Sequence, residues 1–172
     1  NAIEAGLLNG TARVQSSGLS VLGASTFVSR PVVPPPHMAL VFLEVDAIIG
    51  SSALSTVTFL GQSILTNSSM HSTATNPERL IPQATGVYRL SAAASLSSTE
   101  AGRRGLVLMD SSAALAEVQA VASSRGTSLH VSAYKRFDVL GGYARCRVES
   151  VGNSTGTITA GVTATWFALE KL

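Results

Sequence analysis

Charged residues are scarce in this sequence. Of its 172 residues, only 13% are Asp, Glu, Lys or Arg, whereas 45% are hydrophobic. That charged fraction is about half of what a soluble domain usually carries, and a monomer normally needs more charge to stay in solution. The low charge therefore predicts that much of the surface is covered, most simply by identical subunits.

Aromatic side chains, long apolar runs and a basic stripe are also missing. Aromatic residues make up 5% of the chain, and the apolar content comes largely from Ala and Val, which suit tightly stacked sheets and close subunit contacts. No apolar run reaches the ~18 residues of a membrane span. The net charge is +2, and neither Arg103-Arg104 nor Lys135-Arg136 extends into the stripe that phosphate tracking needs. We therefore expect neither nucleic acid nor a membrane as partner.

Signals of processing and of disulfide bonding are equally limited. The chain begins at Asn1 without a methionine or a signal segment, so we expect a processed or excised piece of a longer protein. Its single cysteine, Cys146, excludes an intrachain disulfide. Ala144, Cys146 and Val148 share one face of a predicted strand, which predicts a buried, unreactive thiol.

No constellation of catalytic or metal-binding residues is visible. His37, His71 and His130 are far apart and lack a metal-binding spacing. The segment 152–156 matches the Gly-x-Ser-x-Gly pattern of a nucleophile elbow, but strand-forming residues follow it where an elbow needs a helix. We therefore predict a hairpin turn there, and a protein that is not an enzyme and holds no metal or cofactor.

The sequence divides into two regions. Residues 1–36 hold one possible helical turn, Ala2–Leu8, and then an alternating, glycine-punctuated stretch that cannot bury its own apolar face. The prolines Pro34–Pro36 favour a stiff, extended spacer. We expect an N-terminal stalk or attachment segment over 1–36 and a globular head over 37–172.

The second region consists of short, alternating runs. The clearest places Tyr88, Leu90, Ala92, Ala94 and Leu96 on one inward face. Further runs lie at 41–49, with Val41, Leu43, Val45 and Ala47 on one side, and at 55–60, 105–109, 128–134, 143–150 and 157–169. Residues 113–122 have helical propensity, but their β-rich neighbours favour a strand pair. A turn is expected at 138–142, with positive φ at Gly141-Gly142. Eight or more strands separated by turns predict an all-β sandwich or jelly roll.

A set of short motifs recurs in this order in one group of proteins. The motifs are Ser55–Phe59, Met70-His71, Asn76-Pro77, Arg79-Leu80, Pro82, Gly86–Tyr88, Gly102–Arg104 and Trp166–Leu169. Over about residues 38–172 the chain resembles the globular head of the complement q-subunit and tumour-necrosis-factor superfamily, in the form found in bacterial and phage proteins. The stretch beginning at Gly18 is similar to a repeat of phage fibre shafts.

The resemblance implies a jelly-roll head of about ten strands that assembles as a homotrimer, with its first and last strands meeting at the base. It assigns six residues to the trimer interface or the core signature: Met70, His71, Tyr88, Tyr134, Trp166 and Phe167. The family usually has acidic groups near Leu140. Their replacement by Gly141-Gly142-Tyr143 argues against a calcium site.

Two functions remain open for such a head. In the first, it is a phage fibre or spike tip on the virion surface that binds a host glycan or cell-wall polymer through loops at 67–75, 97–104 and 123–127. Arg103, Arg104 and Arg125 would pair with anionic polymer there, although solvated loop charge is the simpler explanation of all three. In the second, the trimer is a structural capsid decoration, head fibre or trimerisation module, joined to other virion proteins through residues 1–36. A secreted bacterial binding protein is a further alternative.

Overall fold

The computed structural model describes residues 37–50, 53–97, 102–123, 126–151 and 155–172. The predicted stalk over 1–36, with its helical turn and fibre-shaft repeat, lies outside these residues. The described part is almost entirely β, as expected, and its helical content is one 3-10 turn at Ser68–Met70. None of its helices has the length and apolar character needed to cross a membrane.

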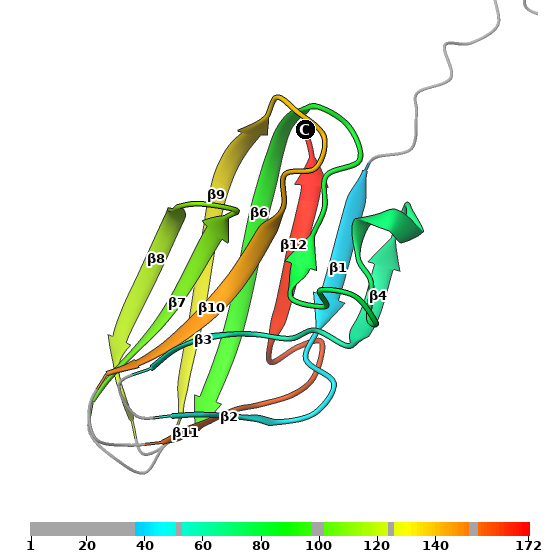
Figure 1. Ribbon diagram of the computed structural model, residues 1–172. Helices are drawn as coiled ribbons and strands as arrows, with labels where there is room; N and C mark the ends of the chain where they lie inside the picture. Colours follow the sequence, from blue (N-terminus) through cyan, green and yellow to red (C-terminus); the bar gives the residue numbers. More distant parts are fainter. Residues whose placement is uncertain (1–36, 51–52, 98–101, 124–125, 152–154) are drawn as a thin grey trace, which may run out of the picture. The chain divides into compact units, whose positions relative to one another are not determined.

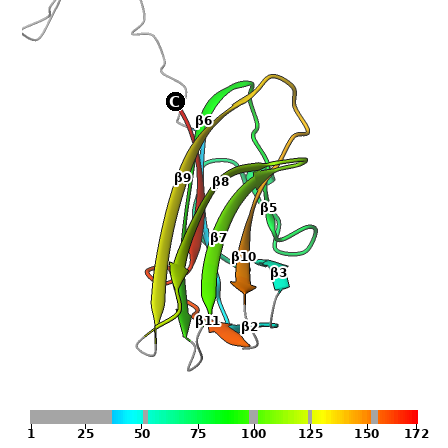
Figure 2. The same cartoon turned by 90° about the vertical axis from the view of Figure 1, so that its left-hand side faces the viewer.

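Two antiparallel sheets pack face to face (Figures 1 and 2). The first comprises β1 (Met38–Phe42), β2 (Ala47–Ile49), β4 (Gly61–Leu65), β6 (Gly86–Ser97), β9 (Thr127–Phe137), β11 (Gly156–Ile158) and β12 (Trp166–Lys171). The second comprises β3 (Ala53–Thr56), β5 (Arg79–Leu80), β7 (Arg103–Asp110), β8 (Ala114–Val121) and β10 (Ala144–Val151). Because β1 and β12 pair along their length, the first and last strands meet as predicted.

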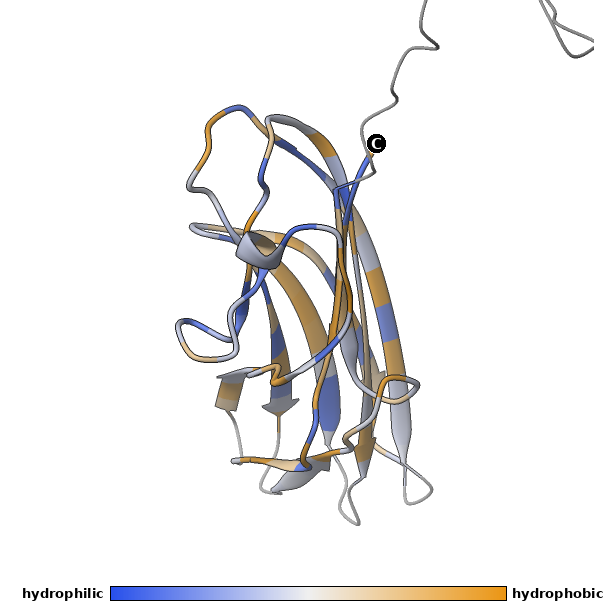
Figure 3. Ribbon diagram, turned by 90° about the vertical axis from the view of Figure 1, so that its right-hand side faces the viewer, coloured by the Kyte–Doolittle hydropathy of each residue, from blue (hydrophilic) through white to orange (hydrophobic). Residues whose placement is uncertain are grey.

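Alternation along β6 determines which side chains form the core. Tyr88, Leu90, Ala92, Ala94 and Leu96 are buried, as the sequence predicts, and the residues between them face outward. Figure 3 shows the same alternation as bands of apolar and polar residues along the strands. The inward side chains of both sheets form one continuous hydrophobic core.

Several predicted segments differ in detail. The expected strand at 55–60 ends at Thr56, because Val57–Leu60 crosses from the second sheet to the first before β4 begins. The backbone amides of Val57 and Phe59 donate to the carbonyls of Cys146 and Pro77 on the way. The inward placement of Val45 is wrong, since β1 ends at Phe42 and Val45 is 69% exposed.

The structure also shows the conformation of the run at 113–122 and of the predicted turn at 138–142. Residues 114–121 form the single strand β8, paired with β7, in place of the strand pair expected over 113–122. In the β9–β10 turn, Gly141 has a φ of 97°, whereas Gly142 does not have positive φ. The turn between β7 and β8 is closed by Asp110, whose Oδ1 accepts hydrogen bonds from the backbone amides of Ser112 and Ala113.

Asp110 also joins the two sheets. Its Oδ2 lies 2.8 Å from Nζ of Lys135 on β9. The Lys135 ammonium and the turn hydrogen bonds hold the pKa of Asp110 well below its usual value, against the opposing effect of burial. This ion pair therefore fixes the C-terminal end of β7 against the neighbouring sheet.

Candidate functional site

The outward face of the first sheet carries an ordered set of side chains on β1, β12, β6 and β9. Strand register places them in three rows that run across the four strands. The rows are Phe42–Trp166–Ala93–His130, Leu40–Ala168–Ser91–Ser132 and Met38–Glu170–Arg89–Tyr134. We call this surface the open face. Alternation on each strand produces it, because the residues between these positions point into the core.

The middle row makes the open face concave. Ala168, Ser91 and Ser132 are short, whereas the rows on both sides carry Trp166, Met38 and Tyr134. The result is a hollow of about 650 Å³ on the sheet, bordered at one side by Val162. A hollow floored by small residues and rimmed by large apolar ones can accept apolar side chains from a partner.

The first row is the most aromatic part of the open face. The rings of His130 and Trp166 lie with their centroids 5.7 Å apart. Phe42 covers Gly61 of β4, and a Cβ atom at Gly61 would overlap the Phe42 ring. The glycine therefore leaves room for the ring beside the neighbouring strand. The whole row remains half-buried or exposed.

The third row is polar at its centre. Arg89 Nη2 donates to Glu170 Oε2 at 2.5 Å, with Arg89 and Glu170 side chains 51% and 34% exposed. Such an exposed pair contributes about 0–1 kcal/mol to folding. The pair lies beside Tyr134, which is 68% exposed. One edge of the hollow therefore carries two charged side chains whose net charge is zero.

The residues predicted as interface or core signature separate into two groups. Met70, Tyr88 and Phe167 are fully buried in the core, whereas Tyr134 and Trp166 lie on the open face. Tyr88 donates its hydroxyl hydrogen to the Ala84 carbonyl at 2.9 Å, and burial raises its pKa. The sequence motif therefore contains both core residues and surface residues.

The sixth residue of that set, His71, holds a loop. It is 3% exposed, and its Nδ1 lies 2.9 Å from Nε2 of Gln62. Its Nε2 lies 2.9 Å from the Pro77 carbonyl. The ring thus joins β4 to the loop before β5, and it does not reach the surface.

The three arginines predicted to bind polymer are not brought together. Arg103 is exposed at the start of β7, whereas Arg104 is fully buried and donates to the Arg103 carbonyl and to Ser150 Oγ. Arg104 is therefore inaccessible to a polymer, because strand alternation turns neighbouring residues to opposite faces. Arg125 lies outside the described residues.

Sequence reasoning missed most of the open face. Met38, Leu40, Ala168, Arg89 and Glu170 were not singled out, although the alternation of β1 and β12 carries the signal. The half-buried positions Met38, Leu40 and Phe42 alternate with the buried positions of β1. Which exposed faces lie side by side follows from the order β12–β1 and β12–β6, and that order joins segments that are far apart in the sequence.

Groups that could carry chemistry are dispersed in the described part of the chain. No three His, Cys, Asp or Glu residues gather there as metal ligands would. Cys146 is buried, and burial raises the pKa of its thiol to about 12, which opposes formation of a reactive thiolate. Strand β11 begins at Gly156, so a strand and not a helix follows the Gly-x-Ser-x-Gly pattern, while residues 152–154 lie outside the described ranges. The predicted hairpin is wrong, because β10 belongs to the second sheet and β11 pairs with β2 and β6 in the first.

Comparison with solved structures identifies the fold. The chain is similar to murine APRIL in a crystal structure at pH 5.0, with 13% sequence identity and a TM-score of 0.58 over 78% of this chain and 99% of that one. It is also similar to the Eiger TNF of S. frugiperda, with 14% identity and a TM-score of 0.60 over 80% of this chain and 93% of that one. No protein-family model matches the sequence, and no curated protein is significantly similar to it.

These likenesses confirm the expected jelly roll of the tumour-necrosis-factor type. At such low identity they show the fold alone. The phage form of the family, the trimer and the shaft segment stay predictions.

Proposed function

We propose that the chain is a non-enzymatic head that assembles into a homotrimer through the open face of its first sheet. The observation that carries this proposal is the concave, largely apolar surface formed by the three cross-strand rows. Soluble monomers rarely leave a large contiguous apolar patch in water, so such a patch marks an interaction site. The low charged fraction of the whole chain, 13%, supports the same conclusion.

A ring of three copies suits the shape of this surface. In a closed ring each copy presents two different patches, so that the hollow of one copy is filled by side chains of the next. A stable interface buries roughly 800 Å² on each partner, an area that a four-stranded sheet face can supply. The Arg89–Glu170 pair at the rim would lose water on assembly and keep its own counter-charge.

We further propose that the trimer is the head of a phage fibre or spike and binds a host-surface glycan or cell-wall polymer. The support is the likeness of the sequence to phage heads and shafts, together with the TNF-type fold. Residues 1–36 would attach it to other virion proteins. A purely structural decoration or trimerisation module, and a secreted bacterial binding protein, are the alternative roles.

The hollow itself favours a second candidate function. Its volume, about 650 Å³, lies within the ~300–1,000 Å³ range of small-ligand pockets. In that reading, a monomer would bind an apolar ligand against Trp166 and Tyr134. The two functions require opposite states of the open face, so oligomeric state separates them.

The test is the native mass of the purified chain over a range of dilutions, by light scattering or sedimentation. We expect a stable mass about three times the 17.7 kDa of the chain. A monomer at all concentrations would overturn the assembly and favour the pocket. Binding of the trimer to intact host cells would support adhesion, whereas firm attachment to capsids without cell binding would support the decoration role.

A further inference from the structure

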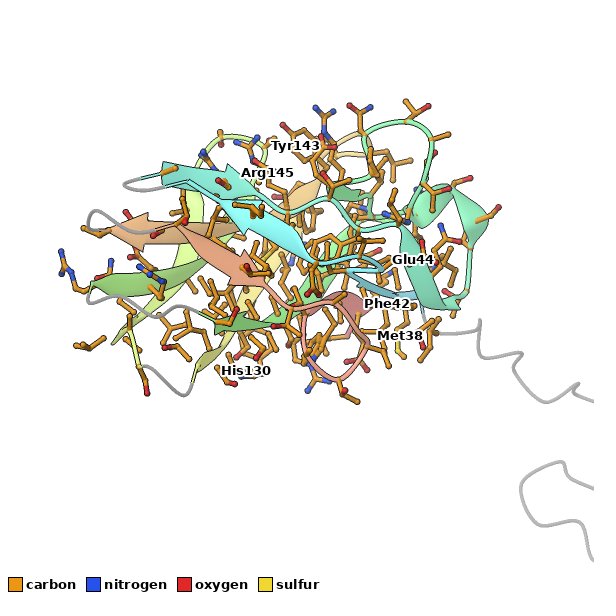
Figure 4. All side chains as sticks on the ribbon, turned by 90° about the horizontal axis from the view of Figure 1, so that it is seen from below. Met38, Phe42, Glu44, His130, Tyr143 and Arg145 are labelled. Atoms are coloured by element: carbon orange, nitrogen blue, oxygen red, sulfur yellow. The ribbon has the colours of Figure 1, made fainter. Side chains whose placement is uncertain are left out.

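Arginine side chains gather on the outward face of the second sheet. Arg79 on β5 lies directly opposite Arg145 on β10, and Arg147 follows two residues later on the same side of β10. Tyr143 stands two residues before Arg145. Figure 4 shows Tyr143 and Arg145 on one side of the sandwich and His130 and Met38 on the other. We call Arg79, Arg145 and Arg147 the arginine row.

The arginine row contains more positive charge than its contacts neutralise. Like charges placed directly opposite on neighbouring strands destabilise a sheet, yet Arg79 and Arg145 occupy such a pair. Arg79 has one counter-ion, with its Nε 3.0 Å from Oε1 of Glu78. Its guanidinium also lies 4.2 Å from the centre of the Tyr143 ring, which holds it in place.

Arg145 is the member without a partner among the described residues. Its Nε is buried and has no hydrogen-bond acceptor there, and none of the ion pairs found in the described ranges includes it. A guanidinium donates hydrogen bonds from all its nitrogens, and an unmet donor at a buried position costs free energy. The Arg145 side chain as a whole is only half-buried, so its guanidinium lacks a counter-ion in the described structure and an anionic group from outside the chain can supply one.

Arg147 also has a buried Nε without an acceptor, but the protein orients the rest of its guanidinium. Its Nη2 donates to the Leu54 carbonyl at 2.8 Å, and its Nη1 lies 3.9 Å from Sδ of Met109. The carboxylates further along this face are engaged with an amide, because Gln119 Nε2 donates to Glu117 and to Glu149. Neither carboxylate forms an ion pair with the arginine row in the described structure.

We propose that the arginine row binds the oxyanion groups, carboxylate or sulfate, of a surface polysaccharide. Arginine is suited to this role because its planar guanidinium donates two parallel hydrogen bonds to such a group. Arg145 would supply the primary contact, Arg79 the second charge, and Tyr143 the surface that fixes Arg79. The site lies opposite the open face, so it stays accessible when that face is covered. This inference rests on the proposed role as a polymer-binding head and names the class of ligand.

The experiment measures binding of the full chain to dextran sulfate, polygalacturonate and neutral dextran. We expect the two anionic polymers to bind and neutral dextran not to bind. The anionic polymer that binds with the higher affinity identifies sulfate or carboxylate as the preferred ligand group. Arg145→Gln should weaken binding by about tenfold or more, since one charge-assisted contact is lost. The matched control is Arg136→Gln, an exposed arginine on β9 paired with Asp138, which should bind within about twofold of the parent.

Three results would overturn the inference. Arg145→Gln could bind as tightly as the parent, Arg136→Gln could lose as much affinity as Arg145→Gln, or duplex DNA could bind as well as the polysaccharides. The native mass of each variant is measured in parallel. If the parent is a trimer but binds neither anionic polymer, the arginine site is refuted and the assembly stands. If the parent binds the anionic polymers as a monomer, the assembly is refuted and the arginine site stands.

The variant is expected to fold. Arg145→Gln removes one of two like charges on opposite strands, so its unfolding temperature without polymer should equal or exceed that of the parent. A clear decrease would show that Arg145 stabilises the sheet and would overturn its assignment as a ligand group. Addition of the anionic polymer should then raise the unfolding temperature of the parent and not that of the variant.

Discussion

The sharpest test of the proposed assembly is Ala168→Arg. Ala168 is at the centre of the open face, between Leu40 and Ser91 in the middle row. Its side chain points away from the core, which Phe167 and Leu169 fill from the two neighbouring positions. An arginine at this position can extend into the hollow of a single copy, so the fold should persist. In a trimer, the same guanidinium would be enclosed by the neighbouring copy.

The expected effect on assembly follows from the cost of an enclosed charge. The carboxylate nearby on the open face, Glu170, is already paired with Arg89. A buried charge left without its own partner costs about 3–5 kcal/mol. Since each ~1.4 kcal/mol is a factor of ten, the contact between copies should weaken by roughly two to four orders of magnitude.

The assay is sedimentation of parent and variant over a range of concentrations, with circular dichroism to verify the β fold. We expect the variant to be a folded monomer at concentrations where the parent is a trimer. The matched control is Ala74→Arg in an exposed loop, which should remain trimeric. A folded Ala168→Arg variant that keeps the parent's mass would refute the reasoning, because the open face would then not be the interface.

Three further experiments test the described structure at fixed protein concentration. Asp110→Asn should lower the free energy of unfolding by about 2–3 kcal/mol near neutral pH. Because the pKa of Asp110 is held below its ordinary value, the parent should lose this stabilisation as the pH falls below about 4. The free energy of unfolding of the variant should therefore depend less on pH in that range. Equal pH dependence in parent and variant would contradict the ion pair. Gly61→Ala should cost about 1–3 kcal/mol by displacing the Phe42 ring, whereas Gly50→Ala, which has space for a methyl group, should cost little. Cys146 should not react with a thiol reagent at pH 8 until the protein is denatured, since its pKa is raised to about 12; prompt reaction of the native protein would show that the thiol is accessible.

Local patterns in the sequence were enough to predict the strands of the core. The alternation from Tyr88 to Leu96 specified which side of β6 is buried, because successive side chains on a strand point to opposite faces. The burial of Cys146 followed from the same rule. The rule fails where a strand ends without a turn signal, which is why the exposure of Val45 was not predicted.

Short polar strands were harder to recognise. Strand β4 contains Gly61, Gln62 and Ser63, which give neither an apolar alternation nor a β-branched run. It forms because β1 offers it a sheet edge, with hydrogen bonds that no local pattern encodes. The basic pair Arg103-Arg104 was assigned to a loop, although strand β7 begins there and turns the two side chains to opposite sides.

The sequence by itself determined that the chain is all-β, which side chains of β6 and β10 enter the core, and that its charge is too low for an ordinary solvated surface. Those properties depend on composition and on the two-residue period of a strand, both of which are local. Only the tertiary structure decided that Ala168, Ser91 and Ser132 floor one hollow, and that Arg79 lies against Arg145. Both depend on strand order and register between distant segments, which are set by how the two sheets bury their apolar faces together.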